Sequence, residues 1–131
     1  MATIFTKIIN GTVPCYKIAE DENYFAFLDI SPNAPGHTIV VPKIEDDYIF
    51  HLDEETYTGL MLFARRVAKA LESCVKCKRI GVAVIGLEVP HTHIHLIPMN
   101  TERDMDMKRH VDLTADQMKA IADEVSKAFE D

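Results

Sequence analysis

A chain of 131 residues, 47% hydrophobic and 27% charged, predicts one soluble globular domain over residues 1–131. Because no segment resembles a membrane span or a signal peptide, we expect a cytoplasmic protein with no membrane partner. The formal net charge of −7 at pH 7 argues against a nucleic-acid partner, since binding a phosphate backbone needs clustered Lys and Arg, but it allows a small nucleotide.

The N-terminal third of the chain predicts one short helix and then strands. Residues 3–11 carry apolar side chains at the spacing of one helical face, and a glycine ends the segment. Residues 16–19 and 24–28 predict two short strands joined by an acidic turn. After a loop with two prolines, the β-branched residues within 37–42 predict a further strand.

The rest of the chain predicts two helices and two more strands. The longest helix spans residues 54–77, with Asp53 as its N-cap. Strands follow at 79–86 and 91–99, and an amphipathic helix capped by Thr114 closes the chain. The order α-β-β-β-α-β-β-α predicts an α+β domain with a mostly antiparallel sheet.

The cysteines Cys15, Cys74 and Cys77 suit a reducing compartment better than a disulfide framework. The last two have the spacing of a redox or zinc motif, but they lie near the end of a predicted helix. A reactive pair needs a helix N-terminus to stabilise its thiolate. We therefore interpret both as helix-end residues without chemistry.

The segment "VPHTHIHLIP" places His91, His93 and His95 at alternate positions of a predicted strand. Side chains on a strand alternate between faces, so the three would project from one side. A solvated face explains one histidine rather than three in register. A metal could join two of them, but the outer pair lies about 13 Å apart, so further ligands such as His37 or Glu88 would be needed.

A catalytic row explains both the number and the spacing of these histidines. Neutral imidazole has a pKa near 6.5 and can therefore attack phosphorus at pH 7. A nucleotidylated imidazole is labile enough for water to complete the turnover. Neighbouring histidines can fix the tautomer of the nucleophile, stabilise phosphate charge or assist the leaving group.

"HTHIHLIP" resembles the His-x-His-x-His-x-x signature of the histidine triad family of nucleotide hydrolases and transferases. The likeness extends to the N-terminal half, which contains "LDISP", "PGH" and "VVPK". The resemblance implies a HIT-like fold, with a five-stranded mostly antiparallel sheet, a long central helix and a C-terminal helix. It also implies a homodimer in which two sheets join into one, and catalysis without a metal or other cofactor.

The resemblance assigns His93 as the nucleophile that attacks the α-phosphorus of a nucleotide derivative. His95 would contact the phosphate oxygens, while His91 and His37 would lie behind His93 and orient its ring. Asp29 would accept hydrogen bonds from the ribose hydroxyls, although a simple turn residue explains it too. Four apolar residues match positions around the base, and core packing explains them equally well: Phe5, Val13, Phe27 and Ile30.

The segment before the triad departs from the family pattern. It is short and carries Glu88 and Val89 at positions where we expect nucleotide contacts. A carboxylate at Glu88 would repel a phosphate unless it were protonated or turned away. Strand alternation would aim Glu88 away from the histidines, whereas Pro90 could break that register and turn it toward them.

A second departure concerns a structural zinc site. Many bacterial members bind zinc through Cys-x-x-Cys near the N-terminus and a later histidine. The corresponding residues here are Thr3, Thr6 and Glu45. Because hydroxyls are poor zinc ligands, we expect no bound metal.

These features predict a hydrolase of purine nucleoside phosphoramidates of the AMP–amine type. Two alternatives stay open. A dinucleoside polyphosphate hydrolase would use the same nucleophile, and a nucleotide-binding or scaffolding protein without catalysis would need only the cleft. The intact histidines favour catalysis, whereas the altered segment before the triad favours the binding protein.

Overall fold

A computed structural model describes residues 2–130, and its sheet has five strands in the order β1-β2-β3-β5-β4. The strands are β1 (Lys17–Glu20), β2 (Tyr24–Leu28), β3 (Thr38–Pro42), β4 (Arg79–Ala83) and β5 (Ile94–Met99). The helices are α1 (Ile4–Ile9), α2 (Glu54–Cys74) and α3 (Ala115–Glu130), with short 3-10 helices η1 (Ile49–His51) and η2 (Glu102–Met105). All neighbouring strands pair antiparallel, which confirms the expected α+β fold.

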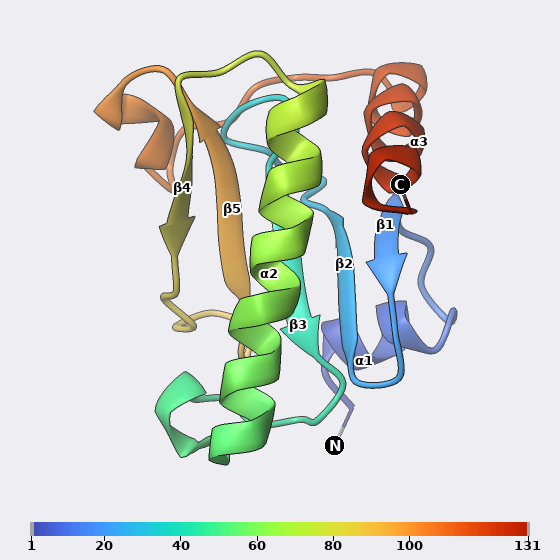
Figure 1. The fold of residues 1–131 in the computed structure, drawn as a ribbon, viewed down its shortest axis with the longest axis vertical. Coiled ribbons are helices and arrows are strands. Elements are labelled where there is room, and N and C mark those ends of the chain that lie inside the picture. The colour runs from blue at the N-terminus through green and yellow to red at the C-terminus, as the bar shows by residue number, and fades with distance from the viewer. Residues whose placement is uncertain (1, 131) are drawn as a thin grey trace.

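The helices divide the sheet into two different faces (Figure 1). Helices α2 and α3 pack against one face through the larger hydrophobic core, which includes the fully buried Leu60, Val67 and Leu71 of α2. Helix α1 packs against the other face through a smaller cluster around Phe5 and Phe27. Because strand side chains alternate, Ile94 and Leu96 point into the larger core, and His95 between them points to the opposite face, on which α1 packs.

Helix α2 begins where the sequence predicts it and ends earlier. The Asp53 carboxylate accepts a hydrogen bond from the Thr56 backbone N–H at 2.8 Å, which caps the first turn. The helix ends at Cys74 instead of residue 77, because the backbone of Val75 is already extended and leads the chain back toward β4. Among residues 2–130, no helix combines the length and the apolar composition that a membrane span requires.

Strand β5 begins at Ile94, so the prediction of a strand over residues 91–99 is wrong for its first three positions. Although β3 itself continues to Pro42, its ladder with β5 ends at the pair Val40–Ile94. There the Thr92 backbone N–H donates to the Asp46 carbonyl at 2.6 Å. Two of the three histidines are therefore held by loop contacts. Strand β4 likewise ends at Ala83, before the predicted residue 86.

Candidate active site

A cleft of about 520 Å³ lies where β5, the loop after β2 and the segment before the histidines meet. Six of the residues singled out by the sequence line it: Phe5, Asp29, Glu88, Val89, His93 and His95. Five others are not part of its wall: Val13, Phe27, Ile30, His37 and His91. Glu88 thus shares a wall with the histidines, as a register break at Pro90 predicts.

His93 is held by the backbone of its neighbour. Its Nδ1 lies 2.7 Å from the His91 carbonyl oxygen, which can only accept, so Nδ1 carries the proton. In the neutral ring Nε2 then keeps a free lone pair. Burial lowers the pKa of His93, partly offset by the bond to the carbonyl, so the ring is neutral at pH 7. Its edge-on contact with Phe5, 4.9 Å between ring centroids, fixes its orientation.

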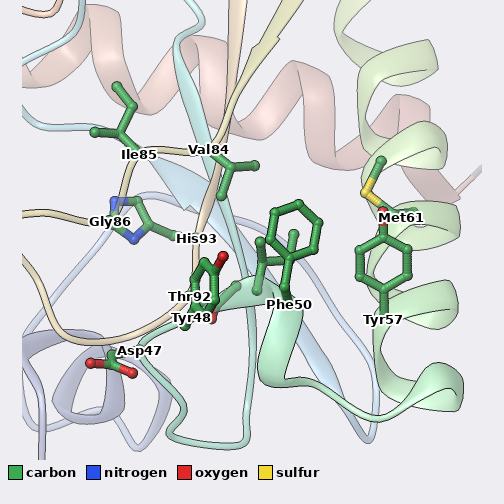
Figure 2. Close-up of a pocket in the computed structure, with 11 residues that line it drawn as sticks. Asp47, Tyr48, Phe50, Tyr57, Met61, Val84, Ile85, Gly86, Thr92 and His93 are labelled. Atoms are coloured by element: carbon green, nitrogen blue, oxygen red, sulfur yellow. The ribbon is translucent and has the colours of Figure 1, made fainter.

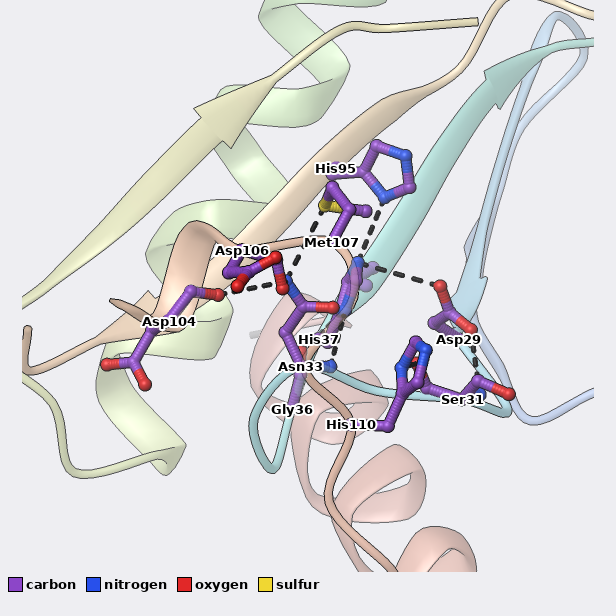
Figure 3. A network of polar contacts seen from close by, with 11 residues as sticks. Asp29, Ser31, Asn33, Gly36, His37, His95, Asp104, Asp106, Met107 and His110 are labelled. Carbon is purple, nitrogen blue, oxygen red and sulfur yellow. Dashed lines mark hydrogen bonds and ion pairs between the residues drawn. The ribbon is translucent and has the colours of Figure 1, made fainter. Parts of the chain in front are cut away.

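His37 orients His95 and not His93, which corrects the role that the resemblance implies. The Asn33 backbone N–H donates to His37 Nδ1 at 3.0 Å, so the proton of neutral His37 is on Nε2. That proton is donated to His95 Nδ1 at 2.9 Å (Figure 3). The arrangement follows from the sheet register, since β3 pairs Ile39 with His95. His95 therefore carries its own proton on Nε2.

Both of these rings are neutral at physiological pH. Burial, followed by the neighbouring His95, lowers the pKa of His37 to about 3. Burial, followed by the neighbouring His93, lowers the pKa of His95 to about 4. The site thus presents a lone pair on His93 Nε2 and an N–H donor on His95 Nε2, with the two ring centroids 4.9 Å apart.

Asp29 uses its two carboxylate oxygens differently. Oδ1 accepts from the Ser31 backbone N–H at 2.8 Å, so the turn interpretation is correct for this oxygen. Oδ2 lies 3.7 Å from His37 Nε2, on the side of the cleft. Burial raises the pKa of Asp29, partly offset by the bond from Ser31. Its second oxygen remains able to accept a hydrogen bond from a ligand.

Asp29, His37 and His95 bring three possible metal-binding atoms within 4.8 Å of one another. Their hydrogen bonds oppose metal binding at this point. His37 Nε2 carries the proton because its Nδ1 is occupied by the Asn33 N–H. A metal on Nε2 would have to displace this proton, so the donor set favours a hydrogen-bonded triad.

Hydrogen bonds join four side chains near the start of α1: Thr3, Thr6, Glu45 and His91. The Thr3 hydroxyl lies 2.8 Å from His91 Nδ1, and the Thr6 hydroxyl donates to Glu45. Hydrogen bonds therefore connect the residues that stand at the family's zinc positions. That no metal binds there stays a prediction.

The four apolar residues that were matched to a base-binding role separate into two groups. Phe5 and Phe27 are buried in the cluster behind α1, which is the core-packing interpretation, and Phe5 also forms part of the cleft wall. Val13 is half-buried, and Ile30 is 79% exposed. A base in contact with Ile30 would lie at the mouth of the cleft; this contact stays a prediction.

Sequence reasoning missed His110, Asn33 and Met107, which also line the cleft (Figure 3). His110 Nδ1 donates to the Ser31 carbonyl at 2.9 Å. The Asn33 side-chain amide donates to the carbonyls of Asp104 at 2.9 Å and Asp106 at 3.1 Å, which ties η2 and the residue after it to the loop after β2. Asn33 lies within "SPNAPGH" and could have been noticed there, whereas no local pattern marks His110.

The charges of the cleft wall are negative. Asp29 and Glu88 contribute carboxylates, and among residues 2–130 no lysine or arginine lines the cleft. A bound phosphate would therefore be held by neutral donors such as imidazole, hydroxyl, amide and backbone N–H groups. A ligand with a positively charged portion would gain from both carboxylates.

A smaller cavity of about 220 Å³ shares His93 and Ile85 with the cleft (Figure 2). Phe50 of η1 and Tyr57 and Met61 of α2 line it. These apolar side chains are unusually open, with Phe50 70% exposed. An apolar surface of this kind is typical of a contact region.

The HIT domain model matches residues 10–102, which is more than half of the chain. The chain belongs to the HIT domain family. An adenosine 5'-monophosphoramidase of Schizosaccharomyces pombe is 32% identical over 130 residues, covering 96% of this chain and 97% of that protein. The adenosine 5'-monophosphoramidase of Saccharomyces cerevisiae is 36% identical over 103 residues, covering 78% of this chain and 65% of that protein.

Solved structures share the fold. A HIT-like protein from Bartonella henselae, crystallised with an unknown ligand, is 27% identical with a TM-score of 0.84, covering 96% of this chain and 95% of its own. A zinc-bound histidine triad family protein from Mycobacterium smegmatis is 26% identical with a TM-score of 0.83, covering 99% and 94%. This HIT-domain chain thus has the fold that the triad resemblance implied.

Proposed function

We propose that this protein is a histidine triad hydrolase that releases AMP from purine nucleoside phosphoramidates, with His93 as the nucleophile. The observation that carries the proposal is the free Nε2 lone pair of His93, set in the cleft wall beside the N–H of His95. The names of the two yeast relatives, both adenosine 5'-monophosphoramidases, support the same activity.

The proposed reaction has two displacements at phosphorus. His93 Nε2 attacks the α-phosphorus, forming an N–P bond as the P–N bond to the amine breaks, and the amine takes up a proton from solvent, which the attacking water returns in the second displacement. Water then attacks the same phosphorus, the His93–P bond breaks, and AMP is released. His95 Nε2–H donates to a phosphate oxygen as negative charge develops there, while Asp29 accepts from a ribose hydroxyl.

The charges of the cleft favour a phosphoramidate over a dinucleoside polyphosphate. Polyphosphates bring several negative charges toward Asp29 and Glu88, and no Lys or Arg in the described cleft wall compensates them. An amine leaving group becomes positively charged when it departs, and both carboxylates stabilise that charge. Glu88 thereby becomes a determinant of substrate choice in this proposal.

The decisive experiment compares kcat/KM for AMP release from an adenosine phosphoramidate with that from diadenosine polyphosphates. We expect the phosphoramidate to be favoured by at least about tenfold, the size of one or two well-placed charge contacts. A reversed preference would establish the polyphosphate hydrolase instead. Nucleotide binding without turnover of either substrate would establish the binding or scaffolding protein.

We also propose a homodimer, formed over β4 and the outer face of α2. Strand β4 is an edge of the sheet, and Val82 on it is 56% exposed. Met61 and Leu62 of α2 are 39% and 53% exposed. A second copy would cover both the edge and these side chains. Sedimentation should give twice the chain mass, and a monomer at micromolar concentration would contradict the dimer.

The state of the cysteines supports a proposal about the compartment in which the protein acts. Cys15, Cys74 and Cys77 are all free and half-buried. Free thiols suit a reducing compartment, which supports the cytoplasmic location that we propose.

A further inference from the structure

We propose that Thr3 is a positioning residue for catalysis: its hydroxyl fixes the tautomer and position of His91, whose backbone carbonyl holds His93. This inference rests on the proposed function for its effect on rate. The contact that carries it joins Thr3 Oγ1 to His91 Nδ1 at 2.8 Å, across 88 residues of sequence.

The surroundings of His91 determine which atom donates in its hydrogen bond with Thr3. The ring is fully buried, and its Nε2 lies 2.7 Å from the Pro42 carbonyl oxygen. Because a carbonyl only accepts, Nε2 must carry the proton of the neutral ring. Nδ1 is then an acceptor, and the Thr3 hydroxyl is the group that donates to it.

The other hydrogen bonds of Thr3 also favour donation from its hydroxyl to His91 Nδ1. Its Oγ1 accepts from the Thr6 backbone N–H at 3.1 Å, which caps α1. The Thr6 hydroxyl donates to the Glu45 carboxylate, which also accepts the Thr3 backbone N–H at 3.3 Å. The Thr3 hydroxyl proton then has two acceptors in reach, Thr6 Oγ1 at 3.2 Å and His91 Nδ1 at 2.8 Å. The shorter contact and the need of the buried His91 Nδ1 for a donor favour His91. Glu45 and His93 are the titratable groups that face this cluster from the neighbouring segments.

The cluster connects α1 to the nucleophile in two ways. Through the ring and backbone of His91, it sets the carbonyl that accepts from His93 Nδ1 at 2.7 Å. Through the cap of α1, it places Phe5, whose ring contacts His91 and His93 edge-on at centroid distances of 5.8 and 4.9 Å. Losing the hydroxyl would leave a buried nitrogen without a donor, and we expect the ring to shift from its present position.

The test compares Thr3→Val, which removes the donor at similar volume, with Thr3→Ser, which keeps it. We expect Thr3→Val to lower kcat about tenfold with little change in KM, and Thr3→Ser to recover most of the rate. Thr12→Val is the matched control: the hydroxyl of this exposed threonine donates to Asn10, outside the site, and its loss should leave both constants unchanged. Wild-type kcat in folded Thr3→Val, or no recovery by Thr3→Ser, would overturn the proposal.

Imidazole ¹⁵N NMR tests the same inference without turnover. In the wild-type protein we expect His91 protonated at Nε2 and His93 at Nδ1, and in Thr3→Val a changed His91 signal. A wild-type His91 protonated at Nδ1 would overturn the proposal, even if Thr3→Val fails to fold. Because this readout needs no substrate, it stays decisive if the protein proves not to be a phosphoramidase.

Discussion

The sheet face under α2 and α3 buries Ile18, Leu28 and Val40 among other apolar side chains, whereas the opposite face buries four histidines beside phenylalanines. Apolar side chains need only fill volume, and their neighbours can adjust to a small change. Each buried ring nitrogen, in contrast, needs a partner of the correct kind. The first face should therefore control stability, and the second should control reactivity.

The histidines themselves form two pairs. His91 and His37 have partners on both ring nitrogens and are locked in one tautomer. In His93 and His95, the hydrogen bond to the protein is made by Nδ1. Both residues line the cleft. The locked pair thus determines which nitrogen of the second pair is available for chemistry.

The largest expected effect is a loss of kcat when His93, one of the two histidines that line the cleft, is replaced. Replacing His93 with Asn should lower kcat by about four orders of magnitude or more, because no other group can form the N–P bond. AMP should still bind, measured by calorimetry, since the loss lies in covalent chemistry. His51→Asn is the control, because His51 is exposed and lies outside the cleft. Normal turnover by the His93 variant would refute the mechanism.

The second prediction concerns pH and the histidine face. The pKa of His37 is about 3 in the folded protein against an ordinary 6.5, so below pH 6.5 the unfolded chain binds the proton that the folded chain excludes. Stability therefore falls as the pH is lowered. Between pH 7 and 5, wild type should lose about 2 kcal/mol more than His37→Gln. Denaturant melts at both pH values measure this, and equal losses would contradict the assigned burial effect.

The third prediction concerns the apolar face. Leu60 of α2 is fully buried, and Leu60→Ala should lower the free energy of unfolding by about 3 kcal/mol. The folded variant should keep its kcat, because this face holds no reactive group. Leu62→Ala, on the exposed side of the same helix, should lower the unfolding free energy of one chain by less than about 1 kcal/mol. A marked loss of kcat in folded Leu60→Ala would mean that the faces are coupled.

The smallest effect is expected at Glu88, an exposed residue of the cleft wall. Water screens its charge, so Glu88→Gln should lower the kcat/KM ratio of phosphoramidate to polyphosphate by only about threefold. Glu72→Gln, on the exposed side of α2, is the matched control. An unchanged ratio would show that Glu88 plays no part in substrate choice.

Local patterns were sufficient for features that depend on near neighbours. The cap at Asp53 and the reciprocal bonds of Thr114 and Gln117 join residues three apart. The apolar periodicity of α2 predicted its buried side, since helical geometry alone determines which residues share a face. The triad spacing predicted that three histidines project from one side; His93 and His95 line one cleft, whereas His91 is not part of its wall.

The partners of the histidines depended on the tertiary structure. His37 contacts His95 across 58 residues, and His110 contacts Ser31 across 79. Which segments meet depends on the strand order β1-β2-β3-β5-β4, and periodicity does not encode that order. The end of β5 at Ile94 was decided in the same way, because the Thr92 backbone N–H donates to the Asp46 carbonyl, outside the sheet.

By itself, the sequence determined the fold class, the family and the histidines to which we assign the chemistry, because these follow from spacing and residue type along the chain. Only the tertiary structure decided which nitrogen of each histidine carries its proton. For His91 that choice depends on Thr3 and Pro42, and for His95 on His37, all from distant segments, whereas His37 itself is fixed by its near neighbour Asn33. A tautomer is a property of the surroundings, and the surroundings exist only once the chain has folded.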